Sequence, residues 1–108
     1  MDSKNEPFEV EFTNECIEEI TEIYEYISNN LKEENAAKRL MTEVTDRVLD
    51  LADEPELYMK IGKVYKLKRE YHRIVVKNYV VLYTIDFEKR KVYISRMIYG
   101  KRNYFNSY

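Results

Sequence analysis

The fold is decided by the stretch that runs from residue 71 to residue 83, which reads Tyr71-His72-Arg73-Ile74-Val75-Val76-Lys77-Asn78-Tyr79-Val80-Val81-Leu82-Tyr83. β-Branched and aromatic side chains, which favour strands, fill residues 71–76 and 79–85 on the two sides of Lys77-Asn78. Two residues suffice for a tight hairpin turn, whereas a crossover between parallel strands needs about a dozen. The stretch therefore predicts an antiparallel β-hairpin.

The strand pattern continues on both sides of this hairpin. Residues 64–68 and 92–99 predict two more strands of the same sheet. Residues 53–63 lack the pattern and are predicted to form a loop, with Gly62 as its turn residue. Near the N-terminus, apolar and polar side chains alternate over residues 8–12, which predicts a short strand with one buried face.

Between the first strand and the loop, apolar residues recur at helical spacing in two segments. In residues 17–31 they follow Thr13 or Asn14, either of which can cap the helix. The second helix is predicted to start at an Asn35 cap and to be ended by Pro55. A short linker joins the two, so they should form an antiparallel hairpin. The sequence thus predicts an α+β fold of order β-α-α-β-β-β-β, with a helical hairpin packed on one face of a mostly antiparallel sheet.

Length and composition indicate one globular domain. The chain has 108 residues, 44% of them hydrophobic and 35% charged, and we expect a single domain with a polar arm at residues 1–7 and a basic-aromatic tail at 101–108. No apolar run approaches the roughly 18 residues that span a membrane, and the acidic start does not resemble a secretory signal. The single cysteine, Cys16, fits a reducing cytoplasm, where we expect the protein to reside. One cysteine and one histidine do not make a transition-metal cluster, so we predict no metal and no cofactor.

Charge divides the chain into two halves. Residues 1–57 hold 17 acidic and 5 basic side chains, whereas residues 58–108 hold 3 acidic and 13 basic ones. Nine of the 11 tyrosines also lie in the basic half. A basic surface with aromatic side chains suits a phosphate backbone whose bases can stack. The alternative interpretation is a tyrosine-rich sheet with solvated lysines.

The hairpin at residues 71–83, the strand at 92–99 and the following Gly100-Lys101-Arg102 together resemble the RelE/ParE superfamily of toxins from bacterial type II toxin–antitoxin modules. The similarity spans residues 8–108 and implies a small toxin that a co-expressed antitoxin neutralises. RelE-like members enter the ribosomal A site and cut mRNA there. ParE-like members share the fold but inhibit DNA gyrase and lack the nuclease residues.

Cleavage of RNA without a metal requires deprotonation of the 2′-hydroxyl, stabilisation of the phosphorane and a proton for the leaving oxygen. The resemblance implies that Arg102 contacts the reacting phosphate and that Tyr108 stacks on or protonates the substrate. It also implies a role for Arg73, for which we favour electrostatic stabilisation because a guanidinium is a poor base. One position departs from the RelE pattern: Val80 stands where RelE-like nucleases usually have an arginine. This departure favours a ParE-like protein or a weakly active nuclease.

Six further residues are predicted to contact RNA, namely Lys66, Lys68, Lys77, Arg96, Lys101 and Tyr104. For the lysines, the alternative is a strand edge protected by charge. By simple alternation, Arg96 shares a strand face with Val92, Ile94 and Ile98. A charge on that face is costly unless it is paired, so Arg96 is either part of a buried ion pair or the floor of a site.

The sequence predicts a RelE-like ribosome-dependent mRNA endoribonuclease that arrests translation. The alternative is a ParE-like gyrase inhibitor that does no chemistry, and a third interpretation is an inactive binding module. The first has the ribosome and mRNA as partners, and the second has DNA gyrase. In each case we expect a cognate antitoxin with an acidic or amphipathic segment covering the basic sheet. An apolar groove between the helical hairpin and the sheet edge would accept its helix or strand.

Overall fold

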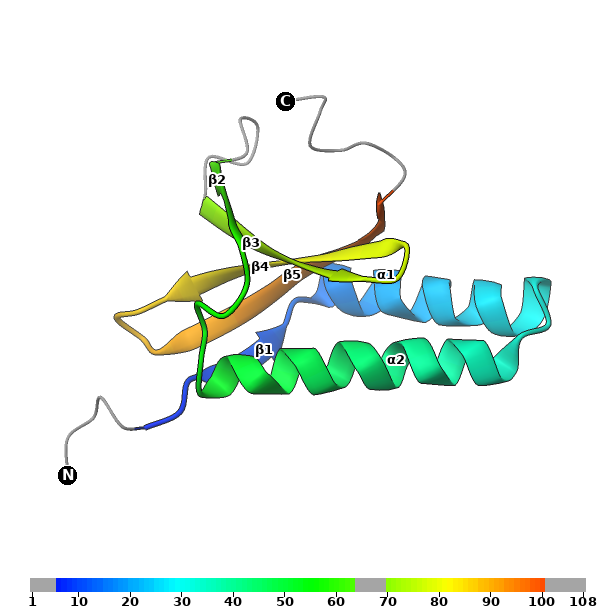
Figure 1. Cartoon of the computed structure of the whole chain (residues 1–108), viewed down its shortest axis with the longest axis horizontal. Helices are drawn as coiled ribbons and strands as arrows, with labels where there is room; N and C mark the ends of the chain where they lie inside the picture. The colour runs from blue at the N-terminus through cyan, green and yellow to red at the C-terminus, as the bar shows by residue number, and fades with distance from the viewer. Residues whose placement is uncertain (1–5, 64–69, 101–108) are drawn as a thin grey trace.

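The computed structural model describes residues 6–63 and 70–100, in which two helices cover one face of a five-stranded sheet (Figure 1). The helices are α1 (Asn14–Glu25) and α2 (Glu34–Leu49), and a π-helical turn, Tyr26–Asn30, extends α1. A 3-10 turn, Asp50–Ala52, follows α2. The strands are β1 (Glu9–Phe12), β2 (Lys60–Lys63), β3 (Glu70–Val76), β4 (Tyr79–Asp86) and β5 (Lys91–Tyr99). The α+β prediction and the order of its elements are confirmed.

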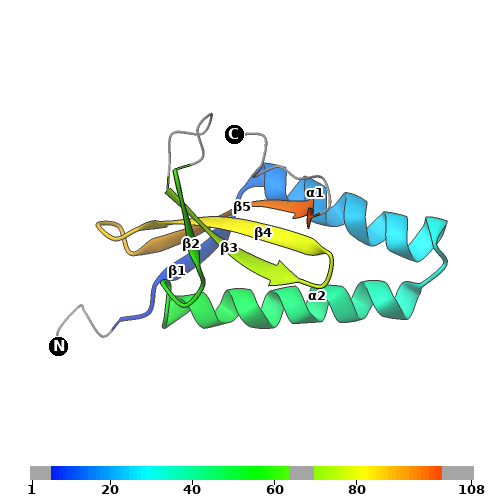
Figure 2. The same cartoon turned by 45° about the horizontal axis from the view of Figure 1, so that its top comes forward.

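The strands lie in the order β1-β5-β4-β3-β2, and every neighbouring pair except β1 with β5 is antiparallel. β1 is parallel to β5. The helical hairpin connects β1 at one edge of the sheet to β2 at the opposite edge (Figure 2). β1 pairs only with the first half of β5, from Lys91 to Ile94. The second half of β5 therefore forms an edge of the sheet.

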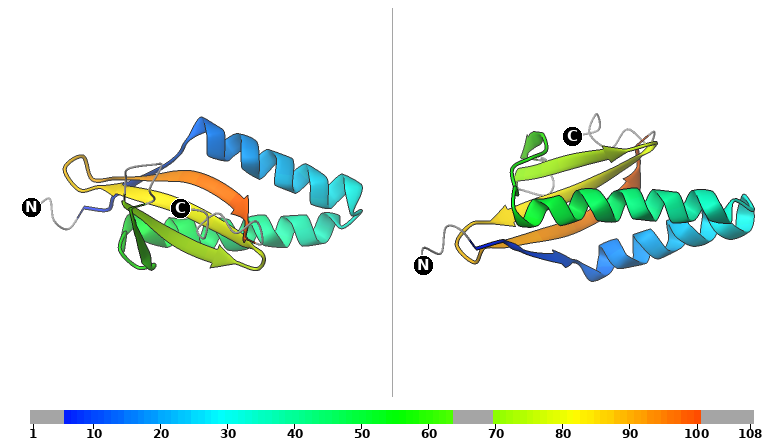
Figure 3. Two further views of the ribbon diagram at one scale, coloured as in Figure 1. Left: turned by 90° about the horizontal axis from the view of Figure 1, so that it is seen from above. Right: turned by 60° about the horizontal axis from the view of Figure 1, so that its bottom comes forward.

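The core lies between the helices and the sheet face that they cover (Figure 3). The strands β3, β4 and β5 contribute most of its sheet side, and α2 contributes one stripe, as expected for amphipathic elements. The fully buried side chains of this layer include Leu40, Val44, Val48, Ile74, Val81, Tyr83, Ile94 and Met97. No helix within the described residues is long and apolar enough to cross a membrane.

The start of α1 is fixed by Thr13, one of its two predicted caps. The Thr13 hydroxyl accepts the Cys16 N–H at 3.1 Å and donates to the Ser95 carbonyl at 3.1 Å, so one side chain caps α1 and joins it to β5. The prediction for α2 is wrong in detail, because the helix already begins at Glu34 and Asn35 lies inside it. It ends at Leu49, several residues before Pro55.

The loop prediction for residues 53–63 is wrong at its end. Residues 60–63 form β2, where Gly62 pairs with Tyr71 across a bulged antiparallel ladder. Long-range backbone pairing with β3 therefore overrides the weak local signal. The strand predicted at 64–68 lies outside the described residues.

The segment between α2 and β2 is held against the sheet by two buried aromatic side chains. His72 Nδ1 lies 2.9 Å from the Tyr58 carbonyl oxygen, and the Tyr83 hydroxyl donates to the Pro55 carbonyl at 2.9 Å. The two rings stack with their centroids 5.0 Å apart. His72 is thus a buried, hydrogen-bonded residue of the sheet.

Candidate functional site

The sheet face opposite the helices, called the outer face below, is where the superfamily resemblance puts RNA. Its centre is apolar in the described part of the chain. Tyr71, Val80, Leu82 and Ile98 are all buried there and form a second cluster, separate from the main core. Val80 is 6% exposed and pairs across the strands with Val75 and Ile98.

Arg73 is the predicted catalytic residue whose position the structure describes. It lies in the middle of β3 and pairs with Leu82, which puts it on the outer face. Its guanidinium Nη2 lies 3.9 Å from the Met59 sulfur, and its backbone N–H donates to the Met59 carbonyl at 3.0 Å. Arg73 therefore stands between an apolar cluster and the exposed Met59, a setting that offers positive charge beside apolar contact area.

β5 ends close to Val80. The Gly100 N–H donates to the Asn78 carbonyl at 2.7 Å, and a Cβ atom added at Gly100 would lie 3.3 Å from Val80 Cγ2 and 3.2 Å from the Asn78 oxygen. At this close contact between β5 and the β3–β4 turn, any residue other than glycine would displace its neighbours. Gly100 thus fixes where the chain leaves the sheet.

The strand face predicted for Arg96 is wrong. Leu82 pairs with Arg96 but Tyr83 pairs with Ile94, so Ser95 is an extra residue on β5. The bulge reverses the alternation, and Arg96 shares the outer face with Ile98 while Val92 and Ile94 face the main core.

Arg96 is held by α1 at the exposed edge of β5. Its Nε and Nη2 atoms donate to Glu19 Oε2 at 2.8 Å and 2.6 Å, and the other oxygen of Glu19 accepts the Met97 N–H at 3.0 Å. Glu15 lies 3.8 Å from Arg96 Nε. Of the two alternatives for Arg96, the ion pair is the one observed, and it is partly buried: the side chains of Arg96 and Glu19 are 30% and 20% exposed.

Lys77 lies at the tip of the β3–β4 hairpin. Its φ of 53° is in the left-handed region that the first central residue of a two-residue hairpin turn adopts. Its Nζ lies 3.8 Å from Glu43 of α2, and the side chain is exposed. The remaining predicted site residues, Lys66, Lys68, Lys101, Arg102, Tyr104 and Tyr108, lie outside the described residues. Of the three predicted catalytic residues, the described part of the chain contains Arg73 alone.

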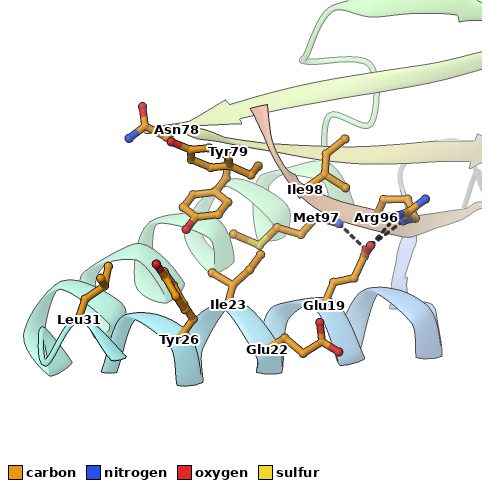
Figure 4. A pocket seen from close by; sticks show the side chains of 11 residues that line it. Glu19, Glu22, Ile23, Tyr26, Leu31, Asn78, Tyr79, Arg96, Met97 and Ile98 are labelled. Carbon is orange, nitrogen blue, oxygen red and sulfur yellow. Dashed lines mark hydrogen bonds and ion pairs between the residues drawn. The ribbon is translucent and has the colours of Figure 1, made fainter. Parts of the chain in front are cut away.

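A groove of about 790 Å³ lies between α1, its π-helical turn and the edge of β5 (Figure 4). Its lining includes Glu19, Glu22, Tyr26, Leu31, Tyr79 and Tyr99. Tyr79 and Tyr99 pack edge to face with centroids 5.6 Å apart, and Figure 4 shows Tyr26 facing Tyr79 across the groove. Burial raises the pKa of Tyr79, and the nearby Tyr99 and Tyr26 raise it further, so its hydroxyl is neutral at physiological pH.

The sequence had predicted a groove at this place but none of the residues that form its aromatic end. Tyr26 and Leu31 owe their positions to the π-helical turn, in which the Leu31 N–H donates to the Tyr26 carbonyl at 3.1 Å. The pairing of Tyr79 with Tyr99 follows from strand register, which a pattern of single residues does not specify.

Neither the thiol of Cys16 nor a set of metal ligands forms a reactive centre in the described part of the chain. Burial, together with the nearby Glu19 carboxylate, raises the pKa of the Cys16 thiol to about 12, so it is protonated and a poor nucleophile. Within residues 6–63 and 70–100, no three His, Cys, Asp or Glu side chains are placed to hold a metal ion.

A two-helix hairpin on one face of this five-stranded sheet is the fold of the RelE/ParE superfamily of toxins. Residues 10–104 match the family described as ParE toxin of type II toxin-antitoxin system, parDE, and the chain belongs to this family. It is therefore the toxin of a type II toxin–antitoxin system. No curated protein sequence matches it.

Solved structures of both branches of the superfamily share the fold. The chromosomal ParDE system of Pseudomonas aeruginosa superposes with a TM-score of 0.67 at 10% identity, over 85% of this chain and 95% of that one. The RelBE2 toxin–antitoxin complex of Mycobacterium tuberculosis gives 0.62 at 21% identity, over 86% and 91%. A mutant of Escherichia coli RelE in the free state gives 0.61 at 11% identity, over 94% and 92%. Identities this low bear on the fold alone.

Proposed function

We propose that this toxin arrests growth by binding DNA gyrase and does not cut nucleic acid itself. The observation that carries the proposal is the apolar centre of the outer face. A phosphorane needs hydrogen-bond donors aimed at its oxygens, and removal of one such donor typically costs about 3 kcal/mol of transition-state stabilisation. Val80, Leu82 and Ile98 have no side-chain donor, and they fill the middle of the face where RNA would lie. Val80, Leu82 and Ile98 are also only 6%, 4% and 7% exposed, so this cluster offers RNA neither a hydrogen-bond donor nor an open surface.

The proposal is supported by the family to which residues 10–104 belong, because the superfamily resemblance connects ParE-like members with gyrase. Purified toxin should inhibit DNA supercoiling by gyrase and trap gyrase–DNA breaks, while a reporter mRNA from cells that express the toxin stays intact in primer extension. Gyrase–DNA breaks are also assayed in the same cultures that supply the reporter mRNA. Cuts within translated codons, with gyrase unaffected, would contradict the proposal.

A RelE-like, ribosome-dependent endoribonuclease is the second candidate, favoured by the position of Arg73 on the outer face at the middle of β3. In this case Arg73, Arg102 and Tyr108 carry the chemistry, and Lys66, Lys68, Lys77, Arg96, Lys101 and Tyr104 contact RNA. Primer extension would then reveal cuts in translated mRNA that disappear in Arg102→Ala and are reduced in Arg73→Ala. Lys89→Ala is the matched control, because Lys89 is an exposed residue of the β4–β5 turn.

The partner common to both candidates is the antitoxin. We propose that it covers the outer face and enters the groove beside α1, and that the complex forms in the cytoplasm, where ribosomes and gyrase are. Two solved relatives are toxin–antitoxin complexes, which supports an antitoxin partner for this chain.

A further inference from the structure

The helix α1, which forms one wall of the groove, is rich in acidic residues. α1 contains five glutamates, Glu15, Glu18, Glu19, Glu22 and Glu25, and no lysine or arginine. By contrast, α2 mixes both signs and pairs them on its own surface, as in Lys38 with Glu34 and Arg47 with Glu43. Of the five glutamates of α1, Glu19 and Glu22 line the groove, and Arg96 of β5 lines it opposite them.

One cation of the sheet compensates only part of this charge. Arg96 engages Glu19 directly and Glu15 at 3.8 Å, so the carboxylate of Glu19 is already satisfied. Glu22 lies one turn further along the same stripe of α1 and lines the groove with its side chain exposed. Among the described residues, no lysine or arginine forms an ion pair with Glu22.

The other end of the groove is apolar and open. The side chains of Tyr26 and Leu31 are 52% and 51% exposed, and Tyr99 is exposed beside them. In Figure 4, Tyr26 and Leu31 face the cavity from the π-helical turn and its end, while Tyr79 lies opposite them on the sheet. Exposed aromatic rings around a cavity are typical of a site that holds a large apolar anchor residue.

We propose that this groove binds a basic amphipathic segment of the antitoxin, with an aliphatic or aromatic anchor among Tyr26, Tyr79 and Tyr99 and a lysine or arginine facing Glu22. The inference rests on the toxin–antitoxin assignment and is independent of the toxin's target. The proposed basic segment differs from the acidic segment that the sequence predicts for the basic sheet. An acidic segment in this groove would place its negative charges beside those of α1.

The test uses the full-length toxin and three helical peptides of about 16 residues, long enough to sample the helix. All three carry the same leucine and phenylalanine stripe, with lysines, glutamates or glutamines on the flanking positions. We expect the lysine peptide to bind at least about tenfold more tightly than the glutamate peptide at low salt, with most of the difference lost near 0.5 M salt. Fluorescence anisotropy at the two ionic strengths measures this.

Variants of the toxin assign the binding to the groove. Glu22→Lys should weaken the lysine peptide about tenfold, and Tyr26→Ala should weaken all three peptides. Glu18→Lys is the matched control, because it makes the same charge change on the same helix at an exposed position that does not line the groove. The cognate antitoxin, titrated against the same variants, should follow the order found with the lysine peptide.

Several results would overturn the proposal. Equal or tighter binding of the glutamate peptide would do so, as would equal losses in Glu22→Lys and Glu18→Lys. If sedimentation shows a toxin dimer that Tyr26→Ala dissociates, a second copy fills the groove and the proposal is wrong. None of these results depends on whether gyrase is inhibited, so a failure here is distinct from a failure of the proposed target.

Discussion

Glu19 and Arg96, which are 77 residues apart in sequence, form a two-point hydrogen-bonded ion pair between α1 and the edge of β5. The free oxygen of Glu19 also accepts the Met97 N–H, so one carboxylate satisfies an edge backbone group and a guanidinium together. An unpaired strand edge invites addition of another strand, and a side chain placed on its N–H groups prevents this. Glu19 therefore stabilises the fold and protects the edge.

Glu19→Ala should lower the free energy of unfolding by about 2 kcal/mol. The substitution leaves the partly buried Arg96 guanidinium and the Met97 N–H without their acceptor. Water can replace only some of these hydrogen bonds. Urea unfolding of the wild type and the variant measures the difference. Glu18→Ala, an exposed change on the same helix, should stay within about 0.5 kcal/mol, and an equal loss in both variants would show that the Glu19 contacts contribute nothing.

Gly100→Ala should destabilise the protein by about 1 kcal/mol. The added methyl group would lie 3.2 Å from the Asn78 carbonyl oxygen and 3.3 Å from Val80, so the hairpin tip has to shift. For a domain of this size, such a loss lowers the melting temperature by roughly 4 °C. An unchanged melting temperature would mean that the hairpin tip shifts without cost. In a protein that already carries Val80→Ala, adding Gly100→Ala should lower the melting temperature less than it does in the wild type, because the contact at Val80 has been removed.

Stability should fall in alkaline solution, between about pH 10 and pH 12, through Tyr83. Burial raises the pKa of its hydroxyl from 10.0 to about 12, so in this range the folded state retains a proton that the unfolded state has lost. The unfolded state binds fewer protons, and the free energy of unfolding decreases with pH by at most about 1.4 kcal/mol per pH unit for this group. Chemical unfolding at pH 9, 10 and 11 should show a shallower decrease in Tyr83→Phe, which also loses the hydrogen bond to Pro55 at every pH. Identical slopes in both proteins would refute the assignment.

Cys16 should react slowly with thiol reagents under native conditions. Its side chain is fully buried and its pKa is raised to about 12, so little thiolate is present at pH 8 and the reagent cannot reach it. The labelling rate should rise strongly in denaturant and also in Glu19→Ala, in which the α1–β5 contact is loosened. Rapid labelling of the native wild type would indicate that α1 opens readily from the sheet.

The hairpin at residues 71–83 and the amphipathic helices could be predicted because their signals are local. Runs of β-branched residues on both sides of Lys77-Asn78 permit few other structures, and the apolar spacing of each helix marks the side that it buries. The family could be recognised for the same reason, since it depends on short pieces of sequence in a fixed order.

Three features of the site could not be predicted in this way. The bulge at Ser95 moves Arg96 to the opposite face, but an extra residue in a strand leaves no mark in the pattern of apolar residues. β2 forms at residues 60–63 because β3 offers a pairing partner, and the segment itself has little strand character. The apolar cluster around Val80 became visible only when the register brought Val80, Leu82 and Ile98 together.

The secondary structure around the central hairpin, the α+β class and the membership in a toxin superfamily follow from local sequence. These properties depend on residues close together in the chain, whose spacing specifies helix or strand directly. Which charges pair with one another depends instead on tertiary contacts. The clamp of Glu19 on Arg96, the aromatic end of the groove and the acidic wall beside it depend on register and on the packing of α1, and those are set by contacts between residues far apart in the chain.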